Sequence, residues 1–196
     1  MSAVPKPIYN ADQYLALEES AEYRSQFYFG EIFAMAGASR RHNIAAGNVY
    51  AIIHAQLRGR RCEIYQNDMR VKVNADFYTY PDIVIVCGEP QIEKKNGENL
   101  LNPTVLIEVL SPSTEKFDRG DKFRYYRLMP SLREYVLVSQ NRVNVEHYFR
   151  QEDNSWLFTA MNDEDEVLEL PSVSCSVNVR DIYDKVDLTE ESLDLR

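Results

Sequence analysis

Thr104-Val-Leu-Ile-Glu-Val-Leu110 is an apolar run with one acidic residue, Glu108, near its middle. Pro103 precedes this run and Ser111-Pro112 follows it, so the run has the length and borders of a strand buried on both faces. A carboxylate inside such a strand is costly unless it is paired, hydrogen-bonded or bound to a cation. The sequence therefore predicts a polar or cationic partner for Glu108 inside the fold.

A second buried strand is predicted upstream of this run. Pro81-Asp82 opens it, and the apolar residues Ile83-Val-Ile-Val86 follow directly. Strands that are apolar throughout belong to the interior of a sheet, so we expect the two to be neighbours. Asp82 and Glu108 then form a small acidic site at one edge of the sheet, which is the geometry of a metal site.

Length and composition favour one globular domain. The chain has 196 residues, enough for one well-buried core and short for two, so we expect a single domain over residues 1–196. No apolar stretch approaches the roughly 20 residues of a membrane helix, and the first residues do not resemble a signal peptide. Cys62, Cys87 and Cys175 are isolated and odd in number, so neither a disulfide framework nor a zinc site is expected. We expect a reduced, cytoplasmic compartment and no membrane partner.

Charge is unevenly distributed along the chain. The net charge is -9, but residues 163–196 alone hold eleven acidic and three basic side chains, a composition typical of a solvated acidic end. Residues 113–133 carry six basic and three acidic side chains. Local patches rather than totals bind phosphates. Nucleic acid therefore remains a possible partner, although tight, nonspecific DNA binding is not expected.

Hydrophobic periodicity and turn residues predict alternating helices and strands. The order of these elements is that of an α/β or α+β fold with a central mixed sheet, flanking helices and appended antiparallel strands. The predicted elements are helices at 10–20, 39–57 and 117–129, a helical turn near 179–185, a hairpin at 23–35, a loop at 88–102, and strands at 62–66, 69–74, 82–86, 104–110, 134–139, 142–149, 155–160 and 166–178.

Several short motifs follow one another in a fixed order. They are Pro81-Asp82, Glu108-Val-Leu-Ser-Pro-Ser-Thr114, Asp118, Lys122, Tyr126 and Glu134-Tyr-Val-Leu-Val138. This ordered set resembles the Uma-type family of restriction-endonuclease-like proteins, which is placed within the PD-(D/E)xK nuclease superfamily. Gly30-Glu31 in the predicted hairpin and His42 at the start of the long helix fit the same family. The resemblance covers roughly residues 8–187.

The resemblance implies a restriction-endonuclease-like core in which Asp82 and Glu108 bind Mg²⁺ or Mn²⁺. The chemistry of the residues agrees, because a hard divalent ion prefers carboxylate oxygens and can activate a water to attack phosphorus. The carbonyl of Val109, beside Glu108, is a candidate third ligand. The expected function is a metal-dependent endonuclease that hydrolyses DNA phosphodiester bonds.

One position departs from the superfamily motif. The motif places a lysine two residues after the acid, on the same strand face, but here that residue is Leu110. We expect Lys122, at the start of the next helix, to replace it by orienting the water or by offsetting charge in the transition state. The alternative is that Lys122 is an exposed lysine paired with Asp118 four residues earlier.

Two further residues are candidates for the site. His42 resembles the histidine of the family and is a candidate for proton transfer or for positioning water. Its alternative role is that of a surface or helix-capping residue. Glu31 resembles the acid that follows the family's glycine and is a candidate third carboxylate near the metal; its alternative is an exposed strand residue. For Asp82 and Glu108, the alternative is a buried acid paired with an arginine.

Other functions remain open on the sequence alone. A catalytically inactive nuclease fold that binds nucleic acid or protein is favoured by Leu110 and by the acidic net charge, whereas an RNA-cleaving or repair nuclease uses the same chemistry. Because cutting both strands of a duplex requires two active sites, we expect a two-fold symmetric homodimer. The predicted apolar surface for this dimer lies on the C-terminal strands and includes Val143, Val145, Tyr148, Trp156 and Phe158.

Overall fold

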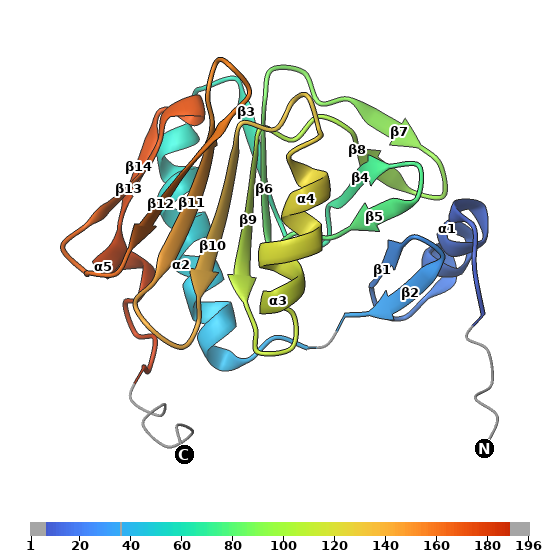
Figure 1. Cartoon of the computed structure of the whole chain (residues 1–196), viewed down its shortest axis with the longest axis horizontal. Coiled ribbons are helices and arrows are strands. Elements are labelled where there is room, and N and C mark those ends of the chain that lie inside the picture. Colours follow the sequence, from blue (N-terminus) through green and yellow to red (C-terminus); the bar gives the residue numbers. More distant parts are fainter. Residues whose placement is uncertain (1–6, 36, 189–196) are drawn as a thin grey trace.

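The computed structural model describes residues 7–35 and 37–188 and contains two six-stranded sheets and one two-stranded sheet (Figure 1). The predicted α/β class with a central mixed sheet is confirmed. In the described part of the chain, no helix is both long and apolar enough to cross a membrane.

The central sheet contains both acidic strands. Its only parallel neighbours in the described chain are β9 and β10, and its other pairs are antiparallel, so the sheet is mixed. The predicted appended strands β11 and β12 extend this sheet. In spatial order its strands are β12 (Trp156–Met161), β11 (Val145–Arg150), β10 (Glu134–Ser139), β9 (Val105–Leu110), β6 (Ile83–Cys87) and β3 (Cys62–Gln66).

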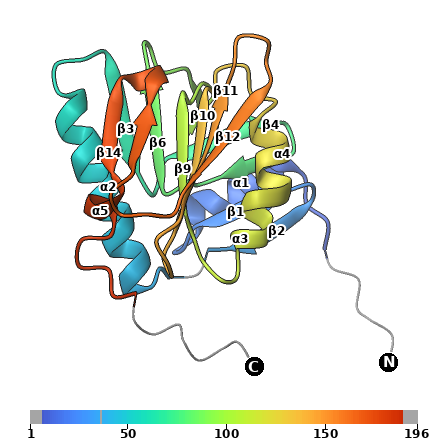
Figure 2. The same ribbon diagram turned by 60° about the vertical axis from the view of Figure 1, so that its left-hand side comes forward.

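The two faces of the central sheet pack against different elements (Figures 1 and 2). Helix α2 (Arg40–Leu57) covers one face, next to the hairpin of β13 (Val167–Leu170) and β14 (Cys175–Asn178). The helical segment that follows β9 covers the opposite face. Side chains of β9 alternate between these faces, so Ile107 joins the apolar cluster under α2, whereas Leu106 and Leu110 join the opposite cluster. Glu108 lies on the Leu106–Leu110 face.

The helical segment after β9 is less regular than the predicted helix at 117–129. It consists of α3 (Glu115–Phe117), a π-helical turn η1 (Asp118–Lys122) and α4 (Phe123–Tyr126). A π-helical turn inserts an additional residue into the helix and is often found at functional sites. The predicted strand at 166–178 is also interrupted, because a 3₁₀ turn at Pro171–Val173 separates β13 from β14. The predicted final helical turn is α5 (Val179–Ile182).

A second sheet lies beside the central one and carries the N-terminal hairpin. Helix α1 (Ala11–Ser20) starts with a capping box formed by Asn10 and Gln13. The prediction of a loop at 88–102 is wrong, because this segment contains two strands. Each strand has three residues, which is too short to give a periodic hydrophobic pattern. In spatial order the strands of this sheet are β2 (Glu31–Ala34), β1 (Ser25–Tyr28), β5 (Phe77–Thr79), β4 (Arg70–Asn74), β8 (Glu98–Leu100) and β7 (Ile92–Lys94).

The expectation that no cysteines pair is wrong. Cys62 and Cys87 lie directly opposite each other on the antiparallel strands β3 and β6, and a disulfide joins them. Cys175 is free and buried. The odd number of cysteines and the separation of 25 residues hid the pair, because only the register of the two strands brings these residues together.

Candidate functional site

Glu108 is buried under the helical segment that follows its own strand, and only 5% of the residue is exposed. Its Oε1 accepts a hydrogen bond of 3.0 Å from the Tyr126 hydroxyl and lies 2.9 Å from Nζ of Lys122. The predicted polar partner of Glu108 is therefore a lysine and a tyrosine from one helical segment, and not an arginine.

Lys122 lies at the end of the π-helical turn, and 3% of it is exposed. Its Nζ donates a hydrogen bond of 2.9 Å to Oδ1 of Asp118, besides its contact with Glu108. The backbone carbonyl of Asp118 accepts a hydrogen bond of 3.1 Å from the Tyr135 hydroxyl on β10, which links the turn to the sheet. The alternative of an exposed lysine is wrong, although the pair with Asp118 does form.

Asp82 precedes β6 and lies where the pairing of β6 with β9 ends. Its Oδ2 accepts a hydrogen bond of 2.7 Å from the backbone N–H of Val109. The same oxygen lies 3.2 Å from Nε2 of His42. The carboxylate thus accepts a hydrogen bond from an N–H of β9 that lies beyond the pairing of β9 with β6. Through His42 it also links the end of β9 to the first turn of α2.

The acidic groups of this cluster affect one another. Burial raises the pKa of the Glu108 carboxyl to about 8 from an ordinary value of 4.5. The Lys122 ammonium opposes this rise, whereas Asp118 and Asp82 add to it. Burial lowers the pKa of Lys122, but its polar neighbours outweigh burial and raise that pKa well above the ordinary value. Lys122 is therefore charged at neutral pH, and Glu108 holds a proton until about pH 8.

His42 belongs to the same cluster. Burial lowers the pKa of its imidazole, but the hydrogen bond with Asp82, the charges of Asp82 and Glu108, and the backbone of Val109 together raise it. Its backbone N–H also donates to Ser39, the N-cap of α2. Nδ1 of His42 is buried and has no hydrogen-bond partner in the described part of the chain. The ring is thus neither a surface group nor a side-chain cap, and one of its nitrogens remains available.

Leu110 occupies the position where the superfamily motif has lysine. It is 2% exposed and packs in the apolar cluster that also contains Tyr126. Its backbone carbonyl accepts a hydrogen bond of 2.8 Å from the Gln140 side chain, which in turn accepts one from Ser39. Leu110 thus lines the same side of the sheet as Glu108 but supplies no charge.

Glu31 begins β2 and pairs across the hairpin with Tyr28. The Tyr28 ring contacts Phe117 and Tyr125 on the helical segment that carries Lys122. The hairpin therefore packs near the site, and the role of Glu31 as a third carboxylate stays a prediction.

Two members of the cluster were missed as site residues. Asp118 is the second carboxylate partner of Lys122, and Tyr126 donates to Glu108. Their spacing with Lys122, four residues on either side, could have identified them, because residues four apart lie on one face of a helix. The Tyr126 hydroxyl is the group that connects this residue to the acid.

The donor set fits a hard divalent cation. Glu108 Oε2 and Asp82 Oδ1 make no hydrogen bond with any residue in 7–35 or 37–188. These described residues contain no group of three or more His, Cys, Asp or Glu side chains arranged to hold a metal. Mg²⁺ commonly takes only one or two carboxylates and completes its shell with water and substrate phosphate. Two free carboxylate oxygens and the Val109 carbonyl suit such an ion.

Comparison with known proteins gives a consistent picture. Residues 11–180 match the Uma2 family, described as "Putative restriction endonuclease". An uncharacterized Synechocystis protein is 35% identical over 182 residues, which cover 92% of this chain and 94% of the relative. A second uncharacterized Synechocystis protein is 37% identical over 163 residues, covering 83% and 92%. A crystal structure from Anabaena variabilis, titled "a putative nuclease belonging to DUF820", has a TM-score of 0.75 over 90% of this chain and 98% of that chain. Its sequence identity is 19%, so this likeness shows the fold.

Proposed function

The chain belongs to the Uma2 family of restriction-endonuclease-like proteins, and we propose that it is an endonuclease that hydrolyses DNA phosphodiester bonds with Mg²⁺ or Mn²⁺. Asp82 and Glu108 would hold the ion, with the carbonyl of Val109 as a further ligand. When bound, the ion would supply Lewis-acid stabilisation of the negative charge on the phosphate.

The observation that carries this proposal is the contact of 2.9 Å between Lys122 Nζ and Glu108 Oε1. A lysine from the following helical segment thereby stands beside the acid, although the strand itself supplies Leu110. A preorganised ammonium in a dry site stabilises developing negative charge more strongly than one in water. A purely structural fold has no need for a lysine buried between two acids, because such burial costs desolvation energy.

The other polar groups of the cluster orient these residues. Asp118 and Glu108 both contact the Lys122 ammonium, and Tyr126 fixes one oxygen of Glu108. His42 holds Asp82 through Nε2 and leaves Nδ1 available to accept or donate a proton. The Asp82 carboxylate and the other acidic neighbours hold the pKa of this imidazole above its ordinary value. Asp118, Tyr126 and His42 are therefore positioning residues. Lys122 would act directly on the phosphate or the attacking water.

The direct test is a cleavage assay on supercoiled, linear and single-stranded DNA and on RNA, with Mg²⁺ or Mn²⁺ and with a chelator. We expect metal-dependent cleavage of DNA by the wild-type protein and none by Glu108→Ala. Glu89→Ala is the matched control, because Glu89 is an exposed carboxylate away from the cluster. Cleavage that persists in Glu108→Ala, or that needs no metal, would contradict the assignment of the site. Cleavage of RNA alone would support the same metal-dependent chemistry, with RNA rather than DNA as the substrate.

Substrate binding is supported by exposed basic residues near the cluster. Lys116 and Arg124 are exposed on the helical segment that carries Lys122, whereas Arg119 is already paired with Glu115 and Glu146. Lysine and arginine near a nuclease site neutralise backbone phosphates. We expect Lys116→Gln and Arg124→Gln to weaken nucleic-acid binding and to lower its salt dependence.

A homodimer is part of the proposal. β12 is an edge strand of the central sheet, and Leu157 and Phe158 on it are 55% and 52% exposed. The predicted contribution of Val145 to this surface is wrong, because that residue is fully buried in the core under α2. Unpaired strand edges with exposed apolar side chains are sites of strand association. Light scattering at micromolar concentration should give the dimer mass, and Leu157→Glu should reduce it to the monomer mass.

A second candidate function is an inactive nuclease fold that binds nucleic acid or protein. The apolar Leu110 in the motif position favours it, as does the net charge of -9. Calorimetric titration with Mn²⁺ distinguishes the two, because a site without catalytic use has no requirement to bind metal. Saturable binding that is lost in Asp82→Ala supports the nuclease, and absence of binding supports the inactive module.

A further inference from the structure

A pocket of about 500 Å³ lies at the end of the central sheet opposite the acidic cluster. Thr104 and Arg133, which line it, immediately precede β9 and β10, whereas Glu108 and Val109 stand toward the other end of β9. At about 3.3 Å per residue, the four positions from Thr104 to Glu108 separate the two places by about 13 Å. The pocket is therefore distinct from the proposed nuclease site.

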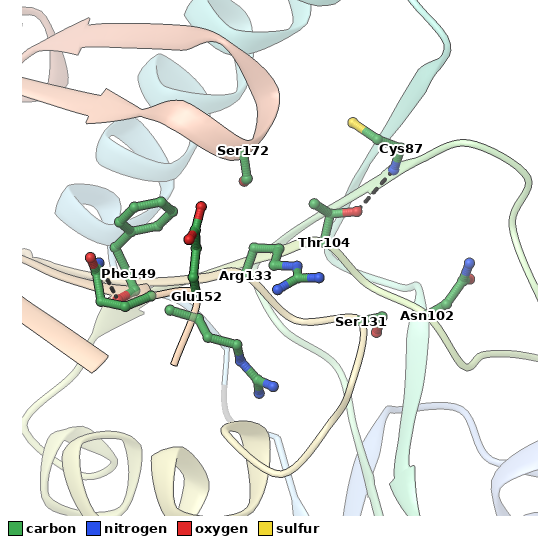
Figure 3. Close-up of a pocket in the computed structure, with 10 residues that line it drawn as sticks. Cys87, Asn102, Thr104, Ser131, Arg133, Phe149, Glu152 and Ser172 are labelled. Atoms are coloured by element: carbon green, nitrogen blue, oxygen red, sulfur yellow. Dashed lines mark hydrogen bonds between the residues drawn. The ribbon is translucent and has the colours of Figure 1, made fainter. Parts of the chain in front are cut away.

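Two arginines line this pocket, and neither forms an ion pair in the described part of the chain. Arg133 is exposed, and its side chain makes no hydrogen bond with any described residue. Figure 3 shows its guanidinium in the middle of the lining, with Phe149 and Glu152 on one side and Thr104 and Ser131 on the other. Glu152 is the acidic side chain of this lining, and it pairs with neither arginine.

Arg150 is the second arginine and is held by the fold. Its Nη2 donates to the carbonyls of Arg127 and Met129 just after α4, and its guanidinium lies 4.9 Å from the centre of the Trp156 ring. Burial and the positive charge of Arg133 lower its pKa. The two guanidinium groups are thus close enough to repel each other, and no described anion compensates them.

Two buried hydrogen-bond donors beside this pocket have no acceptor among the described residues. Five buried side-chain polar atoms lack a partner in the described part of the chain, and two of them, Ser131 Oγ and Arg150 Nε, belong to residues of this lining. By contrast, Thr104 Oγ1 already accepts a hydrogen bond from the backbone of Cys87. Native proteins rarely leave buried polar groups unsatisfied, so an unmatched set of donors indicates a missing acceptor.

We propose that this pocket binds a phosphate monoester, through the guanidinium groups of Arg133 and Arg150 and the hydroxyl of Ser131. A monoester carries close to two negative charges at pH 7, which matches two arginines, whereas a backbone phosphodiester carries one. Guanidinium groups present planar pairs of donors that fit phosphate oxygens.

The size of the pocket indicates a ligand larger than the bare anion. Its volume lies within the range of about 300–1,000 Å³ found for small-molecule sites. Phe149 adds an aromatic ring to the lining, against which a base or another flat group can stack. The ligand class is therefore a phosphorylated molecule of nucleotide size, and it is supplied either as a free mononucleotide or as the 5′-phosphorylated end of a strand.

The test is calorimetric titration of the metal-free protein at fixed ionic strength with inorganic phosphate and with adenosine 5′-monophosphate. We expect saturable binding by the wild-type protein. Hydrogen bonds to a charged group typically account for about tenfold or more in affinity, so Arg133→Gln and Ser131→Ala should each weaken binding by about that factor. Arg58→Gln, at an exposed arginine just after α2, changes the net charge equally and should leave the affinity unchanged. Circular dichroism verifies that each variant is folded.

Competition experiments separate the two sources of phosphate. A 5′-phosphorylated oligonucleotide that displaces the mononucleotide, while the same strand without its phosphate does not, identifies a strand end as ligand; displacement by neither strand identifies a free nucleotide. Both results support the monoester site. Absence of saturable binding up to about 10 mM, equal weakening by Arg58→Gln, or equal displacement by the unphosphorylated strand would overturn it.

Discussion

The two ends of the parallel strands β9 and β10 differ in how their charged groups are compensated. At one end Glu108, Asp118 and Lys122 are buried together, and the Lys122 ammonium lies 2.9 Å from an oxygen of each acid. At the other end Arg133 and Arg150 line one pocket without an ion pair among the described residues. The ammonium at the first end is compensated by an acid of the fold, whereas the two guanidinium groups at the second end have no such partner among the described residues.

This difference shows what the fold supplies by itself and what it leaves to a ligand. A buried cluster whose charges are matched holds its side chains in place before any substrate arrives, which is the requirement for electrostatic catalysis. A pocket with unmatched donors gains stability only when a counter-anion binds. Variants at the acidic end should therefore affect both rate and folding, whereas loss of the Arg133 guanidinium at the arginine end should affect binding alone.

The largest effect is expected from loss of the Lys122 ammonium. Lys122→Ala should lower the cleavage rate by about 10²–10³-fold, the typical result of removing one preorganised charge, while Mn²⁺ binding persists. It should also destabilise the fold by about 3 kcal/mol, because Glu108 and Asp118 lose their shared cation. Single-turnover cleavage, calorimetry and urea unfolding measure the three quantities.

Two companion variants test this mechanism against simple misfolding. Lys122→Arg keeps the buried positive charge but changes its shape, so it should fold yet cleave slowly. Leu110→Lys combined with Lys122→Ala should recover at least part of the rate, because Leu110 and Glu108 lie on one strand face. A wild-type rate in Lys122→Ala would reduce the lysine to a structural role.

A large effect on stability is expected from the disulfide at the arginine end. Cys87 lines the pocket, and its bond to Cys62 closes a loop of 25 residues. Restricting the unfolded chain in this way typically stabilises a protein by about 3 kcal/mol. Reduction should lower the free energy of unfolding by about that amount, while the double variant Cys62→Ser with Cys87→Ser should no longer respond to the reductant. An equal response of both proteins would show that the reductant acts elsewhere.

A smaller effect is expected for the pH dependence of metal binding at the acidic end. Binding of Mg²⁺ requires the ionised Glu108 carboxylate, whose pKa is about 8 in the metal-free protein. The affinity should therefore rise by up to about tenfold per pH unit below pH 8 and level off above it. The number of protons released per Mg²⁺ bound should approach one near pH 6.5 and fall to zero near pH 9. Calorimetry in two buffers of different ionisation enthalpy measures this number. A pH-independent affinity would mean that Glu108 is not a ligand.

The same raised pKa has a consequence for folding. The pKa of Glu108 rises from 4.5 to about 8, so the folded protein binds this proton more tightly than the unfolded chain. Its contribution is fully present below about pH 4.5 and is lost as the pH rises through 8. Glu108→Gln imitates the protonated acid, so it should gain stability relative to wild type between pH 7 and 9. An unchanged difference between the two proteins over that range would contradict the raised pKa.

Much of the acidic end could be predicted from the sequence, and the arginine end could not. Glu108 in an apolar strand requires a partner wherever it lies, and the order of the motifs placed Asp82, His42 and Lys122 near it. The π-helical turn was not predictable, because Asp118–Lys122 has an ordinary amphipathic pattern and its geometry depends on packing.

The pocket had no signal in the sequence because its residues carry no motif. Thr104, Arg133 and Arg150 lie at the ends of three strands, and the pairing of β10 with both β9 and β11 brings them together. The disulfide depends in the same way on the register of β3 with β6. Tertiary pairing, rather than local propensity, determines both features.

The smallest effect is expected from Arg133 in the absence of ligand. Arg133→Gln should change the free energy of unfolding by less than about 0.5 kcal/mol, because its side chain is exposed and makes no hydrogen bond or ion pair with the described residues. Arg150→Gln should cost about 1 kcal/mol, since it loses hydrogen bonds to the carbonyls of Arg127 and Met129. Urea unfolding in phosphate-free buffer measures both values.

Repeating the unfolding of wild type and Arg133→Gln in phosphate provides the sharper comparison. A ligand that binds only the folded state stabilises it in proportion to the logarithm of its concentration over Kd. Wild type should therefore become more stable as phosphate is added, and Arg133→Gln should follow only at concentrations about tenfold higher. Sulfate at equal ionic strength serves as a dianion control and should act through the same arginines. If Arg133→Gln is strongly destabilised without phosphate, then the guanidinium is part of the folded architecture and the contrast between the two ends of the sheet fails.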